Sequence, residues 1–397
     1  METRDAKIGA AKSVDTVMLA ILLILLGLGL TVLLSASFVS AEFYKKNPYF
    51  YFSEQVVNLA IGVLLGILLY FVPYWFWIRF AWVIGLIAVG VLLLMLVPGV
   101  AKHSKGTGRW MAMFPFQPAE AAKLAVVIVL ARYFSHYGIL VKKIGYGLVG
   151  PLLLMVTFCG LIVAETDLGG AIVVAIVVVL MMIAGGVRIW HMALLSPLAL
   201  VVVKLITIFK YRSARITSWI NPWSDPSGSG YNIIHSFYAF ATGGLTGVGP
   251  GQSQQKMFFL PEAYTDYIFS IIGEEMGLIG VVTISFLFLA LGFRGFMTAR
   301  SAKTLSGFYL ALGMTLCVIV PAFINMAVAL SIIPAKGLPL PFFSYGGSSI
   351  VVSCAAMGIV MAVHNQSLKD SPGELAKIAQ RRAPAKPQTG PVLAGKG

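Results

Sequence analysis

The sequence predicts an all-α, polytopic integral membrane protein with about ten transmembrane helices. Of its 397 residues, 58% are hydrophobic and 11% are charged, whereas roughly 25% of the residues in an ordinary soluble domain are charged. The mean hydropathy is +0.89. Long uncharged segments reach the ~20 apolar residues that a helix needs to cross the hydrocarbon core. This composition argues against a soluble enzyme, a disordered chain and a secreted disulfide-rich protein.

Uncharged segments locate the helices because an unpaired charge in hydrocarbon costs several kcal/mol. The first segment ends in Val39-Ser40-Ala41, which resembles a signal-peptide cleavage site. It is longer than the apolar core of a signal peptide, so we expect an uncleaved anchor. The fourth helix begins at Pro118, since proline is favoured in a first helical turn. In chain order, the expected helices cover residues 16–41, 55–78, 80–101, 118–133, 145–164, 168–187, 192–209, 267–293, 305–333 and 348–363.

The distribution of charge orients these helices. With both termini in the cytoplasm, the inner segments carry an excess of 12 positive charges and the outer segments an excess of 2. The positive-inside rule therefore predicts an N-in, C-in topology. Residues 1–15 form a cytoplasmic segment and residues 16–364 the membrane domain, with a large outer loop at about residues 210–266. The basic tail, residues 365–397, is expected to be disordered and to contact anionic lipid or a cytoplasmic partner.

The net charge of +14 mostly reflects this topology and does not indicate a nucleic acid partner. Cys159, Cys317 and Cys354 fall within apolar segments and lack C-x-x-C spacing. They are expected to be small core residues rather than parts of a disulfide framework or a zinc site. The sequence contains no nucleotide-binding P-loop and no Cys/His cluster, so it predicts no metal site.

Bases lie in the expected outer loop after the third helix, against the usual distribution of positive charge. They are Lys102, Lys105 and Arg109. An anionic ligand at the outer surface would account for them, and arginine is suited to bidentate phosphate contacts. A solvated loop that contacts lipid headgroups explains them equally well.

Two pairs of charges lie close to the outer membrane surface. Glu120 and Lys123 are three positions apart at the start of a helix and therefore share one face. Charges within spans are usually functional, although a structural ion pair is the simpler explanation. Glu165 and Asp167 separate two apolar segments, and a short solvated turn explains them almost as well as a functional role.

The long outer loop is rich in Gly, Pro, Ser and aromatic residues, which favours a folded loop that lies against the membrane. Asp266 ends this loop at the expected start of a helix, where helix capping is at least as good an explanation as catalysis. Glu274 and Glu275 lie about two turns deeper. Unpaired carboxylates are costly there, so at least one of them is expected to face the bundle interior.

The last outer loop, residues 334–349, is apolar and interrupted by proline and glycine. Irregular backbone at membrane depth is stable only where protein or a water-filled cavity covers it. The loop is therefore predicted to be re-entrant and to line a cavity. Lys336 and Ser344 lie within it.

These segments resemble the SEDS family of bacteria (shape, elongation, division and sporulation), and its FtsW branch more than its RodA branch. The resemblance covers about residues 15–365. The sequence departs from the usual pattern at Ala119, Asn232, Tyr264 and Pro321, and none of these changes removes an ionisable group. The most specific motifs are Phe116-Gln117-Pro118-Ala119-Glu120 with Lys123, residues 260–275, Pro334-Ala335-Lys336-Gly337 and Ser344-Tyr345-Gly346-Gly347-Ser348-Ser349.

The resemblance implies a peptidoglycan glycosyltransferase. Members of the family polymerise lipid II, an undecaprenyl-pyrophosphate-linked disaccharide pentapeptide, at the outer face of the cytoplasmic membrane and release undecaprenyl pyrophosphate. By position, Asp266 is the implied general base, and Glu120 is implied to position Lys123. The implied substrate-binding residues are Arg109, Glu120, Lys123, Lys336 and Ser344, with Glu165, Asp167, Glu274 and Glu275 as supporting residues.

The same resemblance implies a class B penicillin-binding transpeptidase, other division proteins and membrane lipid as partners, at the division septum. It implies no certain cofactor and leaves open whether Mg²⁺ or Mn²⁺ assists Asp266. Two alternatives remain, a lipid II flippase and a division scaffold without activity. A flippase needs a polar path to the cytoplasm, and the spans that begin at Gln55, Gly145 and Leu168 have almost no polar residues. A pure scaffold would leave Asp266 without a role.

Overall fold

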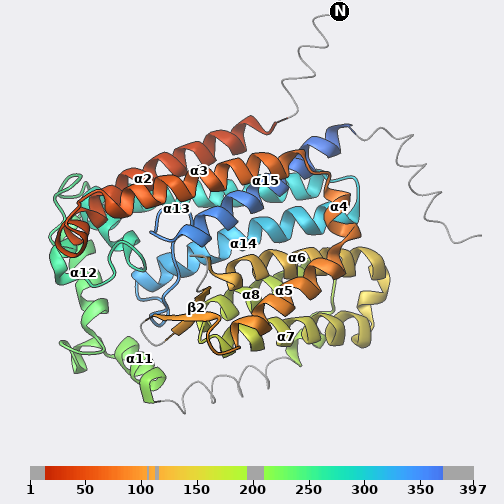
Figure 1. Ribbon diagram of the computed structural model, residues 1–397, viewed down its shortest axis with the longest axis horizontal. Coiled ribbons are helices and arrows are strands. Elements are labelled where there is room, and N and C mark those ends of the chain that lie inside the picture. Colours follow the sequence, from red (N-terminus) through yellow and green to blue (C-terminus); the bar gives the residue numbers. More distant parts are fainter. Residues whose placement is uncertain (1–13, 105–106, 112–115, 195–209, 370–397) are drawn as a thin grey trace, which may run out of the picture.

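The computed structural model describes residues 14–104, 107–111, 116–194 and 210–369. This part of the chain is a bundle of helices, most of which run along one common direction (Figure 1). Among the described residues, seven helices are long and apolar enough to cross a membrane, and two shorter apolar helices accompany them. The predicted all-α, polytopic membrane fold is therefore confirmed.

Each apolar helix lies over one of the expected segments, because the long uncharged runs leave helix as the conformation that satisfies the backbone in lipid. The last one continues beyond the expected residue 363. The helices are α2 (Thr16–Lys45), α3 (Phe50–Phe71), α5 (Ala81–Met95), α6 (Pro118–Tyr137), α7 (Gly150–Ala164), α8 (Leu168–Ala184), α13 (Ile268–Ser301), α14 (Leu305–Ala329) and α15 (Gly347–Lys369).

The second expected helix, residues 55–78, is wrong at both ends. The helix α3 begins at Phe50 and ends at Phe71, and a separate short helix follows, α4 (Tyr74–Arg79). Pro73 separates the two, and the backbone of Val72 before it is extended, with ψ 123°. Proline disfavours helical backbone in the preceding residue and donates no hydrogen bond of its own. The apolar run therefore bends where we expected one continuous helix.

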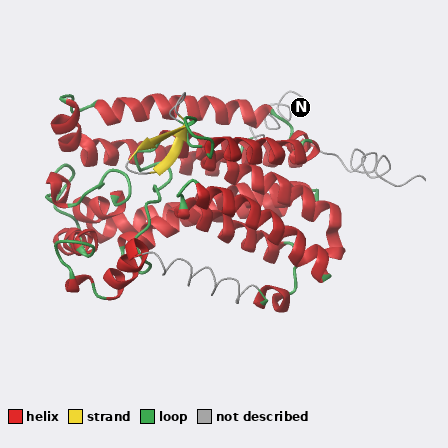
Figure 2. Cartoon of the chain, turned by 60° about the horizontal axis from the view of Figure 1, so that its bottom comes forward, coloured by secondary structure: helices red, strands yellow, loops and turns green. Residues whose placement is uncertain are grey.

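The third expected helix is shorter than predicted, since α5 ends at Met95 and not near residue 101. A small antiparallel hairpin follows, formed by β1 (Ala101–Ser104) and β2 (Thr107–Met111). It is the only sheet in the described part of the chain (Figure 2). Part of the basic loop after the third expected helix is thus a β-hairpin.

The long outer loop is mostly helical. It contains α11 (Lys210–Ile220) and α12 (Tyr231–Gly243), with two short turns, η3 (Pro222–Ser224) and η4 (Gln255–Phe259). Two more short segments, η1 (Gly138–Lys142) and η2 (Gly145–Val149), join α6 to α7. Most of the seventh expected helix, residues 192–209, lies outside the described residues, and only α9 (Ile189–Ala193) is described beside it.

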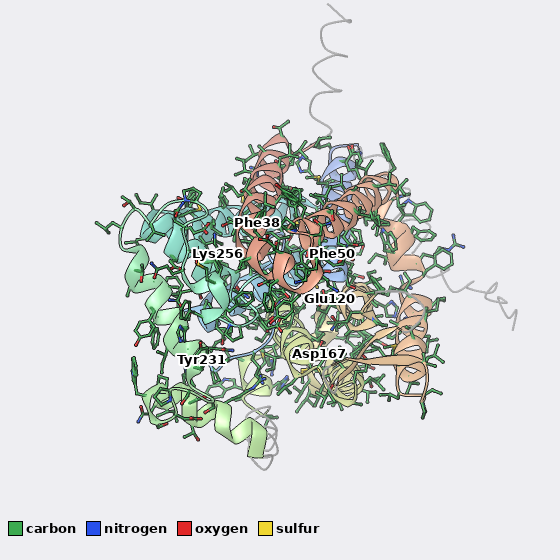
Figure 3. The ribbon with its side chains drawn as sticks, turned by 60° about the vertical axis from the view of Figure 1, so that its left-hand side comes forward. Phe38, Phe50, Glu120, Asp167, Tyr231 and Lys256 are labelled. Carbon is green, nitrogen blue, oxygen red and sulfur yellow. The ribbon has the colours of Figure 1, made fainter. Side chains whose placement is uncertain are left out.

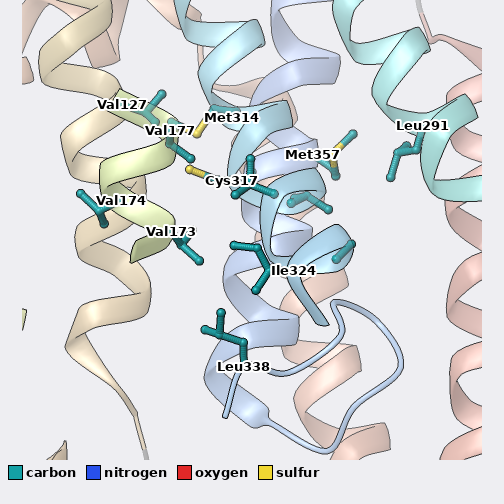
Figure 4. Close-up of a cluster of buried hydrophobic side chains, with 14 of the residues drawn as sticks. Val127, Val173, Val174, Val177, Leu291, Met314, Cys317, Ile324, Leu338 and Met357 are labelled. Atoms are coloured by element: carbon teal, nitrogen blue, oxygen red, sulfur yellow. The ribbon is translucent and has the colours of Figure 1, made fainter. Parts of the chain in front are cut away.

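The helix α14 lies at the centre of the bundle and packs against α6, α8, α13 and α15. Its side chains Met314, Cys317 and Ile324 belong to one buried cluster with Val127 of α6 and Val173 of α8 (Figure 4). Cys317 is therefore a core residue in this region. The helix α14 also carries Asn325, which donates hydrogen bonds to the two outer loops that contain Asp266 and Leu338.

The loop between α14 and α15 reaches deep into the bundle. A Cβ atom added at Gly29, near the middle of α2, would lie 2.2 Å from the carbonyl oxygen of Phe342. Any side chain at position 29 would therefore displace the loop. The absence of a side chain at Gly29 lets non-helical backbone lie against α2, where protein covers it as membrane depth requires.

Candidate functional site

Asp266 lies at the end of the loop that precedes α13. Tyr267, the next residue, is the N-cap of α13, and its side chain makes no capping bond. Asp266 N donates to Glu262 O (3.0 Å), and Asn325 Nδ2 donates to Asp266 O (2.9 Å). Hydrogen bonds with Glu262 and Asn325 thus fix the Asp266 backbone, while the Asp266 side chain is half-buried.

The loop between α14 and α15 lies directly against the Asp266 carboxylate. A Cβ atom added at Gly337 would be 2.8 Å from Asp266 Oδ2, so a side chain there would require the carboxylate to move. Asn325 is buried on α14 and also donates to Leu338 O (2.7 Å). One amide therefore ties this loop to Asp266, and it brings the half-buried Lys336 into the same neighbourhood.

Arg215 of α11 contacts the loop between α14 and α15. Our sequence-based prediction of the site did not include this basic residue. Arg215 Nη1 donates to Ala335 O (3.4 Å), and Trp219 Nε1 donates to Ser331 O (2.8 Å). The two bonds dock α11 on the segment that carries Lys336. The sequence did hold a signal for it, because Lys210, Arg212 and Arg215 place further bases in an outer segment.

The pKa of the Tyr267 phenol responds to the charges of Asp266 and Arg215. Burial and the negative charge of Asp266 raise the pKa of Tyr267 to about 12, whereas the positive charge of Arg215 acts in the opposite direction. Asp266 and Arg215 therefore both lie close enough to act on one side chain. The combination of a carboxylate and a guanidinium at the end of the bundle can accept a proton and stabilise an anion.

Glu120 and Lys123 form a buried ion pair at the start of α6. Lys123 Nζ lies 2.8 Å from Glu120 Oε1, and the exposed fractions of the side chains are 5% and 8%. The cavity beside the pair is about 10 Å³, which holds about one water molecule. In this conformation Glu120 neutralises the ammonium group, and a ligand reaches Lys123 only when the cavity opens.

One turn of α14 connects this ion pair with the surroundings of Asp266. Pro321 lines the cavity beside Lys123, and Asn325, which holds Asp266, is four residues later on the same helix face. The separation along the axis is about 6 Å. The loop after α14 contributes Pro341 to that cavity. The structure thus brings Asp266, Lys336 and the Glu120–Lys123 pair into one region.

Asp167 joins three helices at this end of the bundle. Asp167 Oδ1 accepts from Gly170 N (3.1 Å) and caps α8, while Asp167 Oδ2 accepts from Gln117 Nε2 (2.9 Å). Gln117 N donates in turn to Ser348 Oγ of α15 (2.8 Å). Figure 3 labels Asp167 and Glu120 in this region. The contacts give Asp167 a structural role in holding α6, α8 and α15 together.

Glu165 lies in the turn between α7 and α8 and is 3% exposed. Both of its carboxylate oxygens are buried, and neither has a hydrogen-bond partner among the described residues. Burial, followed by the negative charge of Asp167, raises the pKa of Glu165 to about 7. The following residue, Thr166, has φ 65°. The turn therefore holds a carboxyl group that is easily protonated, and it is more than the solvated turn that we had considered.

Ser344 supports the loop that lies against Asp266. Its Oγ accepts from Leu340 N (2.8 Å) and its carbonyl accepts from Gln55 Nε2 of α3 (3.1 Å). The side chain is buried. Ser344 therefore holds the backbone of the loop in this conformation, and a contact with substrate, as the resemblance implied, is a further role that these bonds do not supply.

Glu274 and Glu275 are buried in α13 and bind the segment before it. Glu275 Oε1 lies 2.8 Å from Lys256 Nζ and accepts from Ser35 Oγ of α2 (2.6 Å). Glu274 accepts from the hydroxyl of Ser253. Lys256 lies well apart from Glu120 and Asp167 (Figure 3). These carboxylates therefore hold α2, α13 and η4 together, apart from Glu120 and Asp167.

Two further predictions concern the position of Arg109 and the binding of a metal ion. The strand β2 carries Arg109, but the side chain of Arg109 lies outside the described part of the chain. Its approach to Asp266 stays a prediction. Among the described residues, no three His, Cys, Asp or Glu side chains gather closely enough to hold a metal ion. A role for Mg²⁺ or Mn²⁺ beside Asp266 stays a prediction.

Comparisons with known proteins agree with this architecture. The sequence matches the family FTSW_RODA_SPOVE, described as a cell cycle protein, over residues 15–369. It is 34% identical over 390 residues to the probable peptidoglycan glycosyltransferase FtsW of Thioalkalivibrio sulfidiphilus, covering 96% of this chain and 98% of that protein. It is 37% identical over 358 residues to stage V sporulation protein E of Bacillus subtilis, and the match covers 89% of this chain and 98% of that protein.

Two solved structures share the fold. One is the rod shape determining protein RodA of Thermus thermophilus, with a TM-score of 0.68 and 27% identity over 90% of this chain and 98% of that chain. The other is a chain of a peptidoglycan synthase complex, with a TM-score of 0.74 and 29% identity. The match covers 90% of this chain and 99% of that chain. That complex is described as coordinating polymerization and crosslinking.

Proposed function

The chain belongs to the FTSW_RODA_SPOVE family of cell cycle proteins, and we propose that its Asp266 region joins lipid-linked sugars into glycan strands. It is a SEDS-family peptidoglycan glycosyltransferase, similar to FtsW, and a multi-pass protein of the bacterial cytoplasmic membrane. The finer proposal is that lipid II serves as donor and acceptor at the division septum. The observation that carries it is a half-buried carboxylate, Asp266, beside two bases at the loop end of the bundle.

In the proposed reaction the 4-hydroxyl of the acceptor GlcNAc attacks the anomeric carbon of the donor MurNAc. A new glycosidic C–O bond forms as the bond from the anomeric carbon to the pyrophosphate oxygen breaks, and undecaprenyl pyrophosphate leaves with the electron pair. Asp266 accepts the hydroxyl proton. A positioned general base contributes ~10²- to 10⁴-fold to the rate. Its half-buried side chain can face a substrate at the membrane surface, while Asn325 and Gly337 fix its position.

The leaving pyrophosphate requires positive charge, since charge that develops on its bridging oxygen must be stabilised in the transition state. Lys336 and Arg215 are proposed to supply it first, because both are partly exposed beside the loop that holds Asp266. Arg109 and Lys123 are proposed as further bases. Glu120 holds the Lys123 ammonium group in place beside a small cavity, which must open for a ligand to reach it.

A class B penicillin-binding transpeptidase is the proposed partner. One structure with the same fold comes from a peptidoglycan synthase complex that couples polymerization with crosslinking. A partner that crosslinks the strands would take the product directly from the outer end of this bundle. Other division proteins and membrane lipid are proposed as further contacts of the assembly.

The enzyme is preferred to a flippase because a translocated headgroup needs a polar path. The cavity between α2, α3 and α15 has a volume of about 330 Å³ and is lined almost wholly by apolar side chains such as Leu22, Ile67 and Met357. Such a lining suits acyl chains and opposes the passage of a pyrophosphate, because burying an unpaired charge is costly.

Reconstitution of the purified chain with lipid II and its transpeptidase partner tests the function. We expect glycan strands that lengthen with time and release of undecaprenyl pyrophosphate. Movement of labelled lipid II between leaflets without polymer would instead support the flippase. If neither occurs while the partner gains activity on preformed strands, the scaffold alternative is supported. Adding EDTA and then Mg²⁺ to the same reaction tests whether a cation takes part.

A further inference from the structure

Three tyrosines from separate segments meet beside Asp266. Tyr51 lies in the first turn of α3, Tyr264 in the loop before α13 and Tyr345 in the loop before α15. The rings of Tyr51 and Tyr264 stack, with centroids 4.7 Å apart and planes 25° apart. Tyr345 meets Tyr51 edge-on at 5.0 Å and Tyr264 at 6.1 Å. We call these three residues the tyrosine cluster; all are partly exposed.

The tyrosine cluster is fixed to the same loops that hold Asp266. Tyr345 N donates to Tyr264 O (2.9 Å), which joins the loop before α15 to the one before α13. Gln55, one turn after Tyr51 on α3, donates to Ser344 O (3.1 Å) and accepts from Gly346 N (3.3 Å). The rings are therefore preorganised, and little conformational entropy is lost when a ligand binds them.

The hydroxyl groups of the tyrosine cluster make hydrogen bonds with one another and with Glu54. The hydroxyl of Tyr345 donates to Glu54, an exposed carboxylate of α3. Burial and a hydrogen bond with the Tyr51 hydroxyl raise the pKa of Tyr264, and burial together with Glu54 raises the pKa of Tyr345. Both phenols are neutral at physiological pH, and their hydroxyls can exchange hydrogen bonds with neutral ligand hydroxyls.

We propose that the tyrosine cluster and Glu54 form a subsite for a pyranose ring of the acceptor glycan. A pyranose offers a face of C–H groups that packs on an aromatic ring and a rim of hydroxyls that pair with phenol and carboxylate oxygens. Tyr264 is two residues from Asp266, so a sugar bound here lies next to the proposed base. The inference rests on the proposed function and identifies which part of the substrate this surface binds.

A lipid anchor is the competing explanation, because tyrosines gather at membrane interfaces. An anchoring tyrosine places its ring among the lipid headgroups. In the tyrosine cluster the rings contact one another instead, and a backbone hydrogen bond joins the residues Tyr345 and Tyr264. Tyr49, two residues before Tyr51, has the outward position of an anchor, since it is 54% exposed and contacts only Phe38 among the described aromatic rings.

Binding of a lipid-free glycan tests the proposal without requiring polymerisation. A soluble tetrasaccharide of alternating GlcNAc and MurNAc is titrated into the full chain in nanodiscs by calorimetry. Tyr51→Leu and Tyr264→Leu are each expected to weaken binding about tenfold, the loss of one stacking contact. Tyr264→Phe keeps the ring and is expected to retain most of the affinity, and Tyr49→Leu is the matched control.

Unchanged affinity in both leucine variants, or no binding of the tetrasaccharide by the wild-type chain, would overturn the subsite. Equal weakening by Tyr49→Leu would also overturn it, because that result indicates a general interfacial effect. Thermal unfolding of each variant separates loss of binding from loss of fold, and Tyr51→Leu is the variant least involved in the loops. Failure of the wild-type chain to polymerise lipid II, with tetrasaccharide binding intact, would refute the proposed function while the subsite stands.

Discussion

Glu165 is a carboxyl group buried without a hydrogen-bond partner among the described residues, and this makes folding stability depend on pH. The pKa of Glu165 rises from 4.5 to about 7 on folding. Between these values the folded protein holds a proton that the unfolded chain has released, so its contribution to stability is complete below pH 4.5 and is lost as pH rises through 7. We expect Glu165→Gln to raise Tm at pH 8 and to change it little at pH 5.

Differential scanning calorimetry at the two pH values measures this difference. Glu42→Gln is the control, because Glu42 is exposed at the end of α2 and should leave Tm unchanged at both. An equal increase in Tm at pH 5 and pH 8 for Glu165→Gln would show that the carboxylate is not the source of the pH dependence.

The Glu120–Lys123 pair allows stability to be separated from chemistry. Lys123→Met leaves the Glu120 carboxylate buried and unpaired, which typically costs ~3–5 kcal/mol. The double variant Glu120→Gln/Lys123→Met removes both charges and is expected to recover most of the lost stability, measured by thermal unfolding. If it recovers stability but polymerises poorly, the charges of the pair act in the reaction. A double variant as unstable as Lys123→Met would contradict the ion-pair explanation.

At the residue scale the sequence located the ionisable groups and their local partners but not their distant ones. Spacing predicted that Glu120 and Lys123 share a helix face, and they form an ion pair. It could not predict Arg215 or Tyr345 as neighbours of the Asp266 loops, because these contacts join segments that are far apart in the chain and depend on tertiary packing. Helix propensity and hydropathy describe local backbone and burial, and neither specifies which loops meet.

The helix α13 is broken at Gly277, and this break determines how the long outer loop attaches. Gly277 has φ 63° and ψ −161°, a conformation open essentially to glycine alone. A Cβ atom there would lie 2.4 Å from Gly247 N and 2.6 Å from Leu245 O. We therefore expect Gly277→Ala to lower stability by about 1–3 kcal/mol through strain, with further loss from the steric clash.

Thermal unfolding of Gly277→Ala checks this expectation. Gly160→Ala in α7 is the matched control, since a Cβ atom at Gly160 meets nothing within 4 Å among the described residues and alanine favours helix over glycine. A Gly277→Ala protein as stable as wild type would mean that α13 can straighten at this point and that the loop contacts are dispensable.

At the element scale hydropathy predicted which segments are helices, and it failed where polar or proline residues set the local backbone. The run from residue 55 to 78 looked continuous, yet Pro73 separates α3 from α4. The outer loop was expected to be folded, but its composition did not locate the helices α11 and α12 that form there. Tertiary contacts hold these two helices, since Trp219 Nε1 of α11 donates to Ser331 O and Ser236 Oγ of α12 donates to Ala329 O, and no local pattern encodes such contacts.

At the scale of the whole molecule, the N-in, C-in orientation is a prediction from charge. We expect a cysteine at Ser229, in the exposed loop before α12, to react with a membrane-impermeant maleimide on intact spheroplasts. A cysteine at Lys303, between α13 and α14, should react only after the membrane is opened. The background is a chain whose native cysteines are replaced. Labelling of Lys303→Cys in intact cells would reverse the topology.

The composition predicted the membrane fold of the whole molecule and the resemblance predicted its family, and both are confirmed. The grouping of Asp266, Asn325 and Gly337 was not predictable from composition, because it follows from the deep loop that packs against Gly29. A chain of this hydropathy could place such a loop in several ways. The packing of α14 at the centre of the bundle selects one of them.

The rate of lipid II polymerisation by Asp266→Asn tests the role of Asp266 most directly. Asparagine keeps the size of the side chain and removes its basicity, so we expect the single-turnover rate to fall ~10²- to 10⁴-fold while lipid II binding is retained. Glu262→Gln, in the same loop, is the control and should polymerise as wild type does. An Asp266→Asn enzyme with the wild-type rate would contradict the assignment of Asp266 as the general base.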